Sequence, residues 1–337
     1  MALEFSWYLP LAVGSQPACT PGRWIQLAQA VEYAGLDALW IPADSRTVDS
    51  LGVAAALCAH TRQLLLHVGV PPQVMLPAAL AATVQSLQSI SGQRISVHLP
   101  DGERGSLHTA FGEWLNRDQR NERVGEFLHL LTRLLAPGAA PLDHHGRYFQ
   151  LKQGGLGLRP LPAPPLILDA SQNSELIAEH AQVCQLAGAH PDEMAREVQR
   201  LRALQPTLRF ALPLGLILRD SEEQAWDAAG QSSQAPCASA QPMADRQVVR
   251  PLFAEHAALR RDEIHPQLWR PHRDRPLTLV GDPPQVAARL QQLHDLGIHQ
   301  VIIHGEPAVA EVLRFSEQVL PLLRARGLHH KAAHHER

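Results

Sequence analysis

The chain has 337 residues, of which 45% are hydrophobic and 19% charged, and its net charge is −3 with histidine counted as neutral. This composition supports a large buried core and excludes a disordered chain. Because Lys and Arg are not in surplus, the chain cannot neutralise many phosphates, and we do not expect a nucleic-acid partner.

Short β-rich runs alternate with longer helical patterns along the chain. Strands are predicted at residues 3–9, 37–41, 64–70, 95–99, 165–168, 183–186, 209–218 and 301–304. Helices are predicted at residues 24–33, 49–59, 77–90, 118–135, 174–180, 191–204, 221–229, 286–296 and 308–323. Strands that alternate with helices in this way predict a parallel (β/α)8 barrel of the TIM type, although an open doubly wound sheet shows the same alternation.

The strand–helix pattern resumes after two stretches that exceed ordinary loop length, 137–164 and 231–278. We therefore interpret both as insertions in a single barrel domain over residues 1–326. The remaining residues, 327–337, are rich in histidine and are expected to form a disordered tail.

Cysteines and apolar runs indicate the compartment. The chain has 4 cysteines and no CxxC pair, which is typical of free thiols in a reducing cytoplasm. The first ten residues do not have the pattern of a secretory signal, and no uncharged apolar run approaches the roughly 18 residues that span a bilayer. We expect a cytoplasmic protein without a membrane partner.

Several phrases, in order, carry a resemblance to a known family. They are FSWYLP at 5–10, VEYAGLDALWIP at 31–42, SLQSISGQR at 86–94, HHGRYF at 144–149 and LVGDPPQVAARLQQLHDLGI at 279–298. Together they resemble the alkanesulfonate monooxygenase branch of the luciferase-like flavin-dependent monooxygenases, from about residue 3 to 324. The resemblance implies a luciferase-like barrel that takes reduced FMN from a separate flavin reductase and uses O₂ to oxygenate a small molecule. It also implies a homo-oligomer, a dimer or a tetramer.

The same resemblance suggests site residues at the C-terminal ends of the strands, where barrels place their chemistry. It implies catalytic roles for Thr47, which relatives match with a cysteine or threonine near the flavin, and for Glu306, which stands where relatives carry a tyrosine. Thr47 is equally explained as a helix-start residue before Asp49.

Four residues fall at cofactor positions of the family. Asp101 replaces a threonine beside the flavin ring, although it could simply begin a loop. Arg117 and Asn121 replace a histidine and a tyrosine that help to hold the phosphate, although Arg117 is equally typical of a solvated surface. Ser171 remains from the family's phosphate turn, but Asp169 before it would place a negative charge near the phosphate.

Other positions depart from the family. Pro213 and Gly215 stand where relatives carry an arginine and a histidine, and proline is awkward in a central strand. Arg270 and Arg273, in a segment that matches the substrate lid of relatives, are the candidate substrate-binding residues. This pattern favours a substrate other than a simple alkanesulfonate, neutral or cationic.

Two alternatives remain open. A catalytically silent paralogue that binds flavin weakly or not at all could act as a subunit or regulator, and then no cofactor is needed. F420 could replace FMN. A metal-dependent hydrolase is less favoured, because His67 and His98 lie inside predicted strands without an HxH pair or a supporting set of carboxylates.

Overall fold

The computed structural model describes residues 2–11, 20–43, 48–101, 112–138, 140–156, 161–234, 260, 262–270, 276–306 and 308–330. In these ranges the strands are β1 (Glu4–Tyr8), β2 (Ala38–Ile41), β3 (Leu65–Gly69), β4 (Ile95–Leu99), β5 (Leu142–His145), β6 (Gln150–Gly154), β7 (Leu166–Asp169), β8 (Val183–Gln185), β9 (Arg209–Leu218), β10 (Glu263–His265), β11 (Leu268–Trp269), β12 (Thr278–Gly281) and β13 (Gln300–His304). The helices are α1 (Pro21–Tyr33), α2 (Ser50–Cys58), α3 (Pro77–Ser91), α5 (Arg117–Leu135), α6 (Ser174–His180), α7 (Pro191–Leu204), α8 (Glu222–Gln234), α9 (Pro283–Asp295), α10 (Ala308–Gln318) and α11 (Leu320–Ala325).

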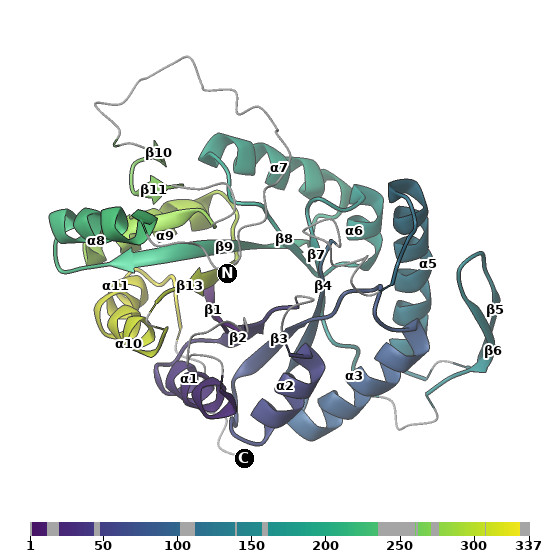
Figure 1. The fold of residues 1–337 in the computed structure, drawn as a ribbon. Helices are drawn as coiled ribbons and strands as arrows, with labels where there is room; N and C mark the ends of the chain where they lie inside the picture. Colours follow the sequence, from purple (N-terminus) through teal and green to yellow (C-terminus); the bar gives the residue numbers. More distant parts are fainter. Residues whose placement is uncertain are drawn as a thin grey trace.

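The predicted barrel is confirmed. Parallel strands follow one another in the order β13, β1, β2, β3, β4, β7, β8 and β9, and β9 pairs back to β13 to close the ring. Helices surround the strands in Figure 1. Closure excludes the open doubly wound sheet. Among the described helices, none is both long and apolar enough to cross a membrane.

Local sequence explains where the helices begin and end. Pro21 and Pro77 occupy the first turns of α1 and α3, where a missing N–H has no cost. Capping boxes begin α5, through Asn116, and α9, through Asp282. Gly92 ends α3 with a φ of 70°, a left-handed conformation that favours glycine. The family phrase at 279–298 therefore corresponds largely to a strand, a helix cap and a helix.

The core has two layers, set by the alternation of side chains along the strands. From β1, Phe5 and Trp7 are fully buried in the large cluster that the strands share with the helices. A smaller cluster of Trp40, Ile167, Val183, Ala211 and Ile302 is contacted by Tyr8. Its residues come from barrel strands on several sides of the ring, so this cluster fills the barrel interior.

Arg94 explains another family phrase, SLQSISGQR. The side chain is only 9% exposed. Its guanidinium donates to the hydroxyl of Thr61 at 2.8 Å and to the backbone carbonyls of Cys58, Thr61, Leu64 and Ser91. Arg94 therefore joins the ends of α2 and α3 to the start of β3, a structural role.

The first insertion contains a hairpin, β5–β6, that packs beside α5 (Figure 1). The Glu126 carboxylate of α5 accepts from the backbone N–H groups of Tyr148 and Phe149, at 3.0 and 2.9 Å, and lies 2.9 Å from Nε2 of His144. Glu122 accepts from the Tyr148 hydroxyl at 2.8 Å. Glu122 is exposed, whereas Glu126 is half-buried and holds the hairpin against α5.

The described strands β10 and β11 of the second insertion, with β12 directly after it, extend the sheet beyond the barrel along the second half of β9. On this side of β9, Ala211 pairs with Gln185 of β8, and Gly215 pairs with Thr278 of β12. Pro213 lies between these positions, after β8 has ended and before β12 begins. Its missing N–H therefore costs no hydrogen bond on that side, which explains why a central strand tolerates proline.

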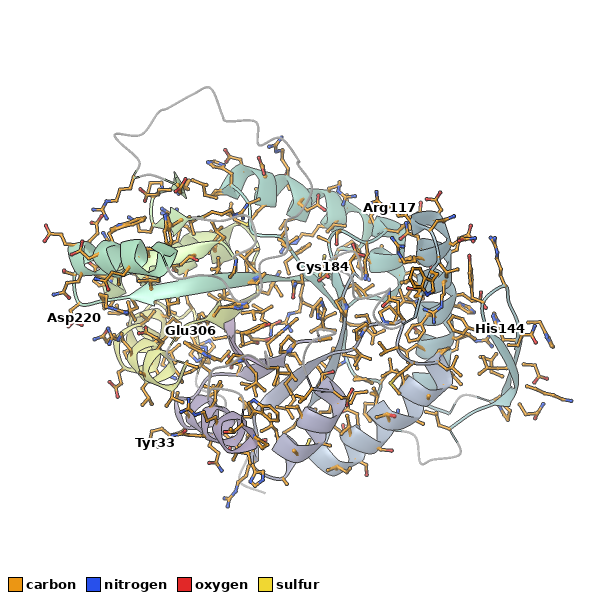
Figure 2. All side chains as sticks on the ribbon, viewed as in Figure 1. Tyr33, Arg117, His144, Cys184, Asp220 and Glu306 are labelled. Atoms are coloured by element: carbon orange, nitrogen blue, oxygen red, sulfur yellow. The ribbon has the colours of Figure 1, made fainter. Side chains whose placement is uncertain are left out.

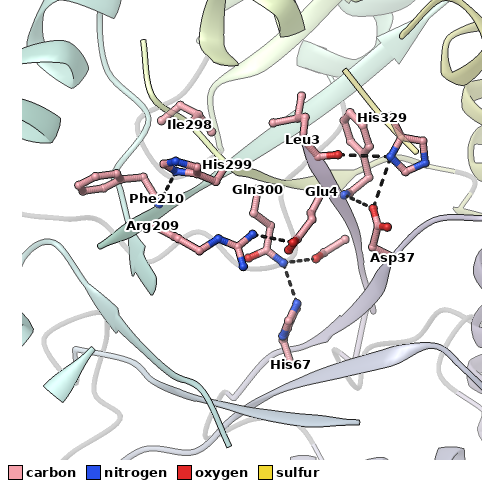
Figure 3. A network of polar contacts seen from close by, with 12 residues as sticks. Leu3, Glu4, Asp37, His67, Arg209, Phe210, Ile298, His299, Gln300 and His329 are labelled. Carbon is pink, nitrogen blue, oxygen red and sulfur yellow. Dashed lines mark hydrogen bonds and ion pairs between the residues drawn. The ribbon is translucent and has the colours of Figure 1, made fainter. Parts of the chain in front are cut away.

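Polar side chains lie inside the barrel near the N-terminal ends of the strands (Figure 3). Glu4 forms an ion pair with Arg209 at 2.6 Å. The Gln300 amide donates to the hydroxyl of Ser6 at 2.7 Å and lies 2.6 Å from Nε2 of His67. Burial, with Arg209 nearby, lowers the pKa of His67 to about 3, so this imidazole is neutral.

The C-terminal segment closes the same end of the barrel. The N–H of Leu3 donates to the Leu328 carbonyl at 2.6 Å. Nδ1 of His329 lies 3.2 Å from the Leu3 carbonyl and 3.7 Å from Asp37, whose carboxylate accepts from the N–H of Phe5 (Figure 3). Leu328 and His329 are both buried, so the folded domain extends past residue 326, where the sequence places its end.

Candidate functional site

A small hollow lies at the C-terminal ends of β4 and β7, where the first turns of α5 and α6 approach them. Its lining is Gln73, Pro100, Asp101, Arg120, Asn121, Val124, Gln172, Asn173 and Leu176. The C-terminal ends of barrel strands are the usual position of a functional site. The hollow is therefore our candidate for the binding of a small molecule.

The polar atoms of the hollow include both donors and acceptors. Oε1 of Gln73 and Oε1 of Gln172 are buried and accept no hydrogen bond from the described residues. The amide nitrogen of Gln172 donates to the Leu99 carbonyl at 3.0 Å, which fixes the oxygen as the free acceptor. Arg120 adds a positive charge to the wall and donates to the Leu115 carbonyl at 2.7 Å. Buried acceptors without donors are costly, so the lining fits a ligand that carries hydroxyl groups together with an anionic group.

A histidine–aspartate pair lies beside the hollow. Nε2 of His98, on β4, is 3.0 Å from Oδ1 of Asp169, the last residue of β7, and both side chains are buried. The other oxygen of Asp169 accepts from the backbone N–H of Asp101 at 2.9 Å. Both oxygens of Asp169 therefore have partners within the protein, and the expected proximity of this carboxylate to a ligand's phosphate stays a prediction.

Aromatic rings lie along the neighbouring strand ends. Tyr8 and His304 stack with centroids 4.0 Å apart, and Trp40 lies 4.8 Å from the His98 ring. Tyr8 pairs with Trp40 in the ladder between β1 and β2. Burial lowers the pKa of His304 to about 3, so its imidazole is neutral at physiological pH.

The structure brings some of the predicted site residues together. Asp101 and Asn121 both line the hollow. Arg117 is one helical turn before Asn121 on α5 and is exposed. Ser171 lies in the turn between β7 and α6, next to Gln172, and is exposed.

Other predicted residues lie elsewhere. Glu306 is exposed just after β13, and Figure 2 shows it well apart from Arg117 in this view. Thr47 and Arg273 fall outside the described residues.

Arg270 is half-buried and donates to the carbonyl of Gly188, just beyond β8. Burial lowers its pKa, and Glu193 only partly opposes this effect. Its Nε is buried without a hydrogen-bond partner among the described residues. The contact of Arg270 therefore joins the end of β11 to the segment just after β8. Its positive charge is only partly balanced by Glu193.

Sequence reasoning missed Arg120, Gln73, Gln172 and the His98–Asp169 pair. Arg120 lies three residues after Arg117, so the helical period placed it near the predicted phosphate position. His98 was interpreted as a core histidine, and only the fold brings Asp169 beside it. Among the described residues, no group of three or more His, Cys, Asp or Glu side chains could hold a metal ion.

Comparisons with known proteins agree with this architecture. An EDTA monooxygenase from Chelativorans sp. BNC1 superposes with a TM-score of 0.76 at 17% identity, over 98% of this chain and 96% of the other. A riboflavin lyase, solved with modified FMN and riboflavin, gives 0.77 at 19% identity, over 98% and 93%. A coenzyme F420-dependent tetrahydromethanopterin reductase from Methanopyrus kandleri gives 0.70 at 14%, over 96% and 99%.

At these identities the solved structures establish the fold alone. The family model described as luciferase-like monooxygenase matches residues 3–300, which is most of the chain. This protein belongs to the luciferase-like monooxygenase family.

Proposed function

We propose that this protein is a flavin-dependent monooxygenase that uses reduced FMN and O₂ to oxygenate a small organic substrate. The observation that carries the proposal is the hollow at the ends of β4 and β7, with its mixture of a cation and unsatisfied acceptors. FMN supplies the activation of O₂ when it is bound; the protein supplies the binding site and the orientation of the substrate.

The lining residues divide by their chemistry. Arg120 and the amide of Asn121 can donate to a phosphate, with Arg117 one turn away as a second cation. The oxygens of Gln73 and Gln172 can accept from the hydroxyl groups of a sugar-alcohol chain. These two needs coincide in FMN, which has a phosphate at the end of a polyhydroxylated chain, and we assign the hollow to that part of the cofactor.

The substrate in this proposal is neutral or cationic rather than a simple alkanesulfonate. Pro213 and Gly215 on β9 carry no charge that could bind a sulfonate. Arg270 remains a proposed substrate contact, because its buried Nε has no partner among the described residues. Thr47 and Glu306 remain proposed catalytic residues, Ser171 a proposed contact of the cofactor, and Arg273 a proposed contact of the substrate.

A fluorescence titration with FMN, repeated anaerobically with reduced FMN, tests the cofactor. We expect micromolar binding of the reduced form and about tenfold weaker binding for Arg120→Gln, because a charge-assisted contact to the phosphate is lost. Arg133→Gln, an exposed change in the last turn of the same helix, is the matched control and should bind as the wild type.

No binding of either flavin form at millimolar concentration would favour the alternative, a catalytically silent paralogue that acts as a subunit or regulator. Binding of F420 in place of FMN would keep the oxidoreductase class and change the cofactor. Equal affinities for the two arginine variants would remove Arg120 from the site.

The proposal includes a separate flavin reductase as partner, a homo-oligomeric state and a cytoplasmic location. Light scattering after size-exclusion chromatography measures the oligomer. Oxygen uptake with FMN, NADH and an added reductase measures the coupling.

A further inference from the structure

The tautomer of His98 follows from its neighbours. Asp169 accepts from the N–H of Asp101 with one oxygen and faces Nε2 of His98 with the other, so Nε2 carries the ring proton. This arrangement leaves the lone pair of Nδ1 available. Among the described residues, none forms a hydrogen bond with Nδ1, so this atom can accept a proton from a ligand.

Aromatic rings lie beside His98. We use the term aromatic arc for His304, Tyr8, Trp40 and His98, which lie toward the C-terminal ends of β13, β1, β2 and β4, with β3 between the last two strands. Trp40 and His98 are 3% and 6% exposed, while Tyr8 and His304 are half-buried. The arc has flat surfaces for stacking and, with His304 neutral, carries no fixed charge apart from the Asp169 carboxylate behind His98.

A pair of this kind is the usual arrangement of a general base. The carboxylate orients the imidazole and stabilises the imidazolium that forms when the ring accepts a proton. A sulfonate has no proton to lose at neutral pH, so such a base would be useless toward it. A weakly acidic hydroxyl group on an aromatic ring has a proton that this base can remove, and the ring can stack on the aromatic arc.

We propose that the aromatic arc binds a phenol-type substrate and that His98 is the base that removes its hydroxyl proton. The O–H bond breaks, the proton moves to Nδ1 of His98, and the electron pair stays on the phenolic oxygen. Asp169 then faces an imidazolium, with which it forms a buried ion pair. The phenolate ring is richer in electrons than the phenol and is the better acceptor of an oxygen atom, a step that rests on the proposed flavin-dependent function.

The binding step is tested without flavin, with 4-nitrophenol as the probe, because its phenolate is yellow and its phenol is not. Absorbance is followed against pH with the protein in excess. We expect the wild type to bind the phenolate about tenfold more tightly than the phenol, which lowers the apparent pKa of the bound probe by about one unit.

His98→Gln and Asp169→Asn should both abolish this shift, since the first removes the base and the second removes the carboxylate that stabilises its charged form. His60→Gln, an exposed change at the end of α2, is the control and should keep it. Thermal unfolding of each variant identifies any that does not fold. A probe that titrates as in free solution, an unchanged shift in the His98 variant, or no binding at millimolar concentration would overturn the proposal.

The result is separable from the test of the cofactor. A shifted 4-nitrophenol titration with no flavin binding would retain the base and reject the monooxygenase. Flavin binding with an unshifted titration would retain the monooxygenase and reject His98 as the base.

Discussion

Oε1 of Glu126 lies 2.9 Å from Nε2 of His144, and this contact joins the long helix α5 to the β5–β6 hairpin. Burial raises the pKa of Glu126, but the hydrogen bonds from His144 and from the N–H groups of Tyr148 and Phe149 outweigh it, and the pKa lies below its usual value. The carboxylate is therefore ionised at neutral pH and accepts all of these contacts.

Replacing this carboxylate should release the hairpin. For Glu126→Ala we expect a loss of about 1–3 kcal/mol in the free energy of unfolding, because two backbone N–H groups lose their acceptor. Hydrogen exchange at Tyr148 and Phe149 measures the release directly. Glu122→Ala is the matched control, since its contacts with Arg147 and Tyr148 are exposed; exchange that is equally fast in both variants would refute the role of Glu126.

Arg94 should not be replaceable by lysine. Lysine keeps the charge but cannot reach the hydroxyl and the several carbonyls that the planar guanidinium binds at once. We expect Arg94→Lys to cost about 3 kcal/mol, because several buried carbonyls lose their donor. Urea unfolding measures the loss. Arg62→Lys, at an exposed position, should change stability by less than about 0.5 kcal/mol; a similar small effect at Arg94 would contradict its structural role.

Asp37 should make the protein less stable as the pH rises. Burial raises its pKa from 3.8 to about 7, so the folded state holds the proton more tightly than the unfolded chain. The stabilisation is complete below about pH 4 and is lost as the pH rises toward 7, with an upper limit of about 4 kcal/mol. Asp37→Asn keeps an acceptor for the N–H of Phe5 and should unfold at a higher temperature than the wild type at pH 8.

The same variant should show no advantage at pH 4, where Asp37 is largely protonated in the folded wild type. Thermal unfolding of both proteins across this pH range provides the comparison. A constant difference between them at every pH would mean that Asp37 does not titrate as its burial requires.

Pro213 should be replaceable, although it lies in the middle of a barrel strand. Because neither β8 nor β12 pairs with this position, Pro213→Ala should cost less than about 1 kcal/mol, mostly from the greater freedom of the unfolded chain. Ala211→Pro, two residues earlier, removes a paired N–H and should cost about 3 kcal/mol or more. Chemical unfolding measures the loss of stability in each variant. Similar losses would contradict the absence of a backbone hydrogen bond at position 213 on the side of β8 and β12.

The sequence was sufficient for the order of strands and helices because these elements are coded locally. The short apolar run LLHVG predicts β3 and helical spacing predicts α7, while Pro, Asn and Asp mark the helix starts. Closure could not be read from the pattern, since it depends on the long-range pairing of β9 with both β8 and β13. The β5–β6 hairpin was hidden because its strand residues are mostly polar and their partner is a glutamate on another element.

The candidate site was less predictable for a related reason. Asp101 and Asn121 could be placed from the family pattern, and both line the hollow. His98 and Asp169 are 71 residues apart, and neither is unusual in its own segment. Their pairing arises because β4 and β7 are neighbours in the ring, with an insertion between them in sequence.

The hydrogen bond between Leu3 and Leu328 means that the two ends of the folded domain lie side by side. A short linker could therefore join them, and the chain could be opened elsewhere without changing the order of the strands around the ring. The tip of the β5–β6 hairpin at Arg147, which is exposed and lies outside the barrel wall, is a natural place to cut. Such a circular permutant would place α5 and the hollow's helical wall near one new terminus, so that a reporter fused there would lie close to the ligand site.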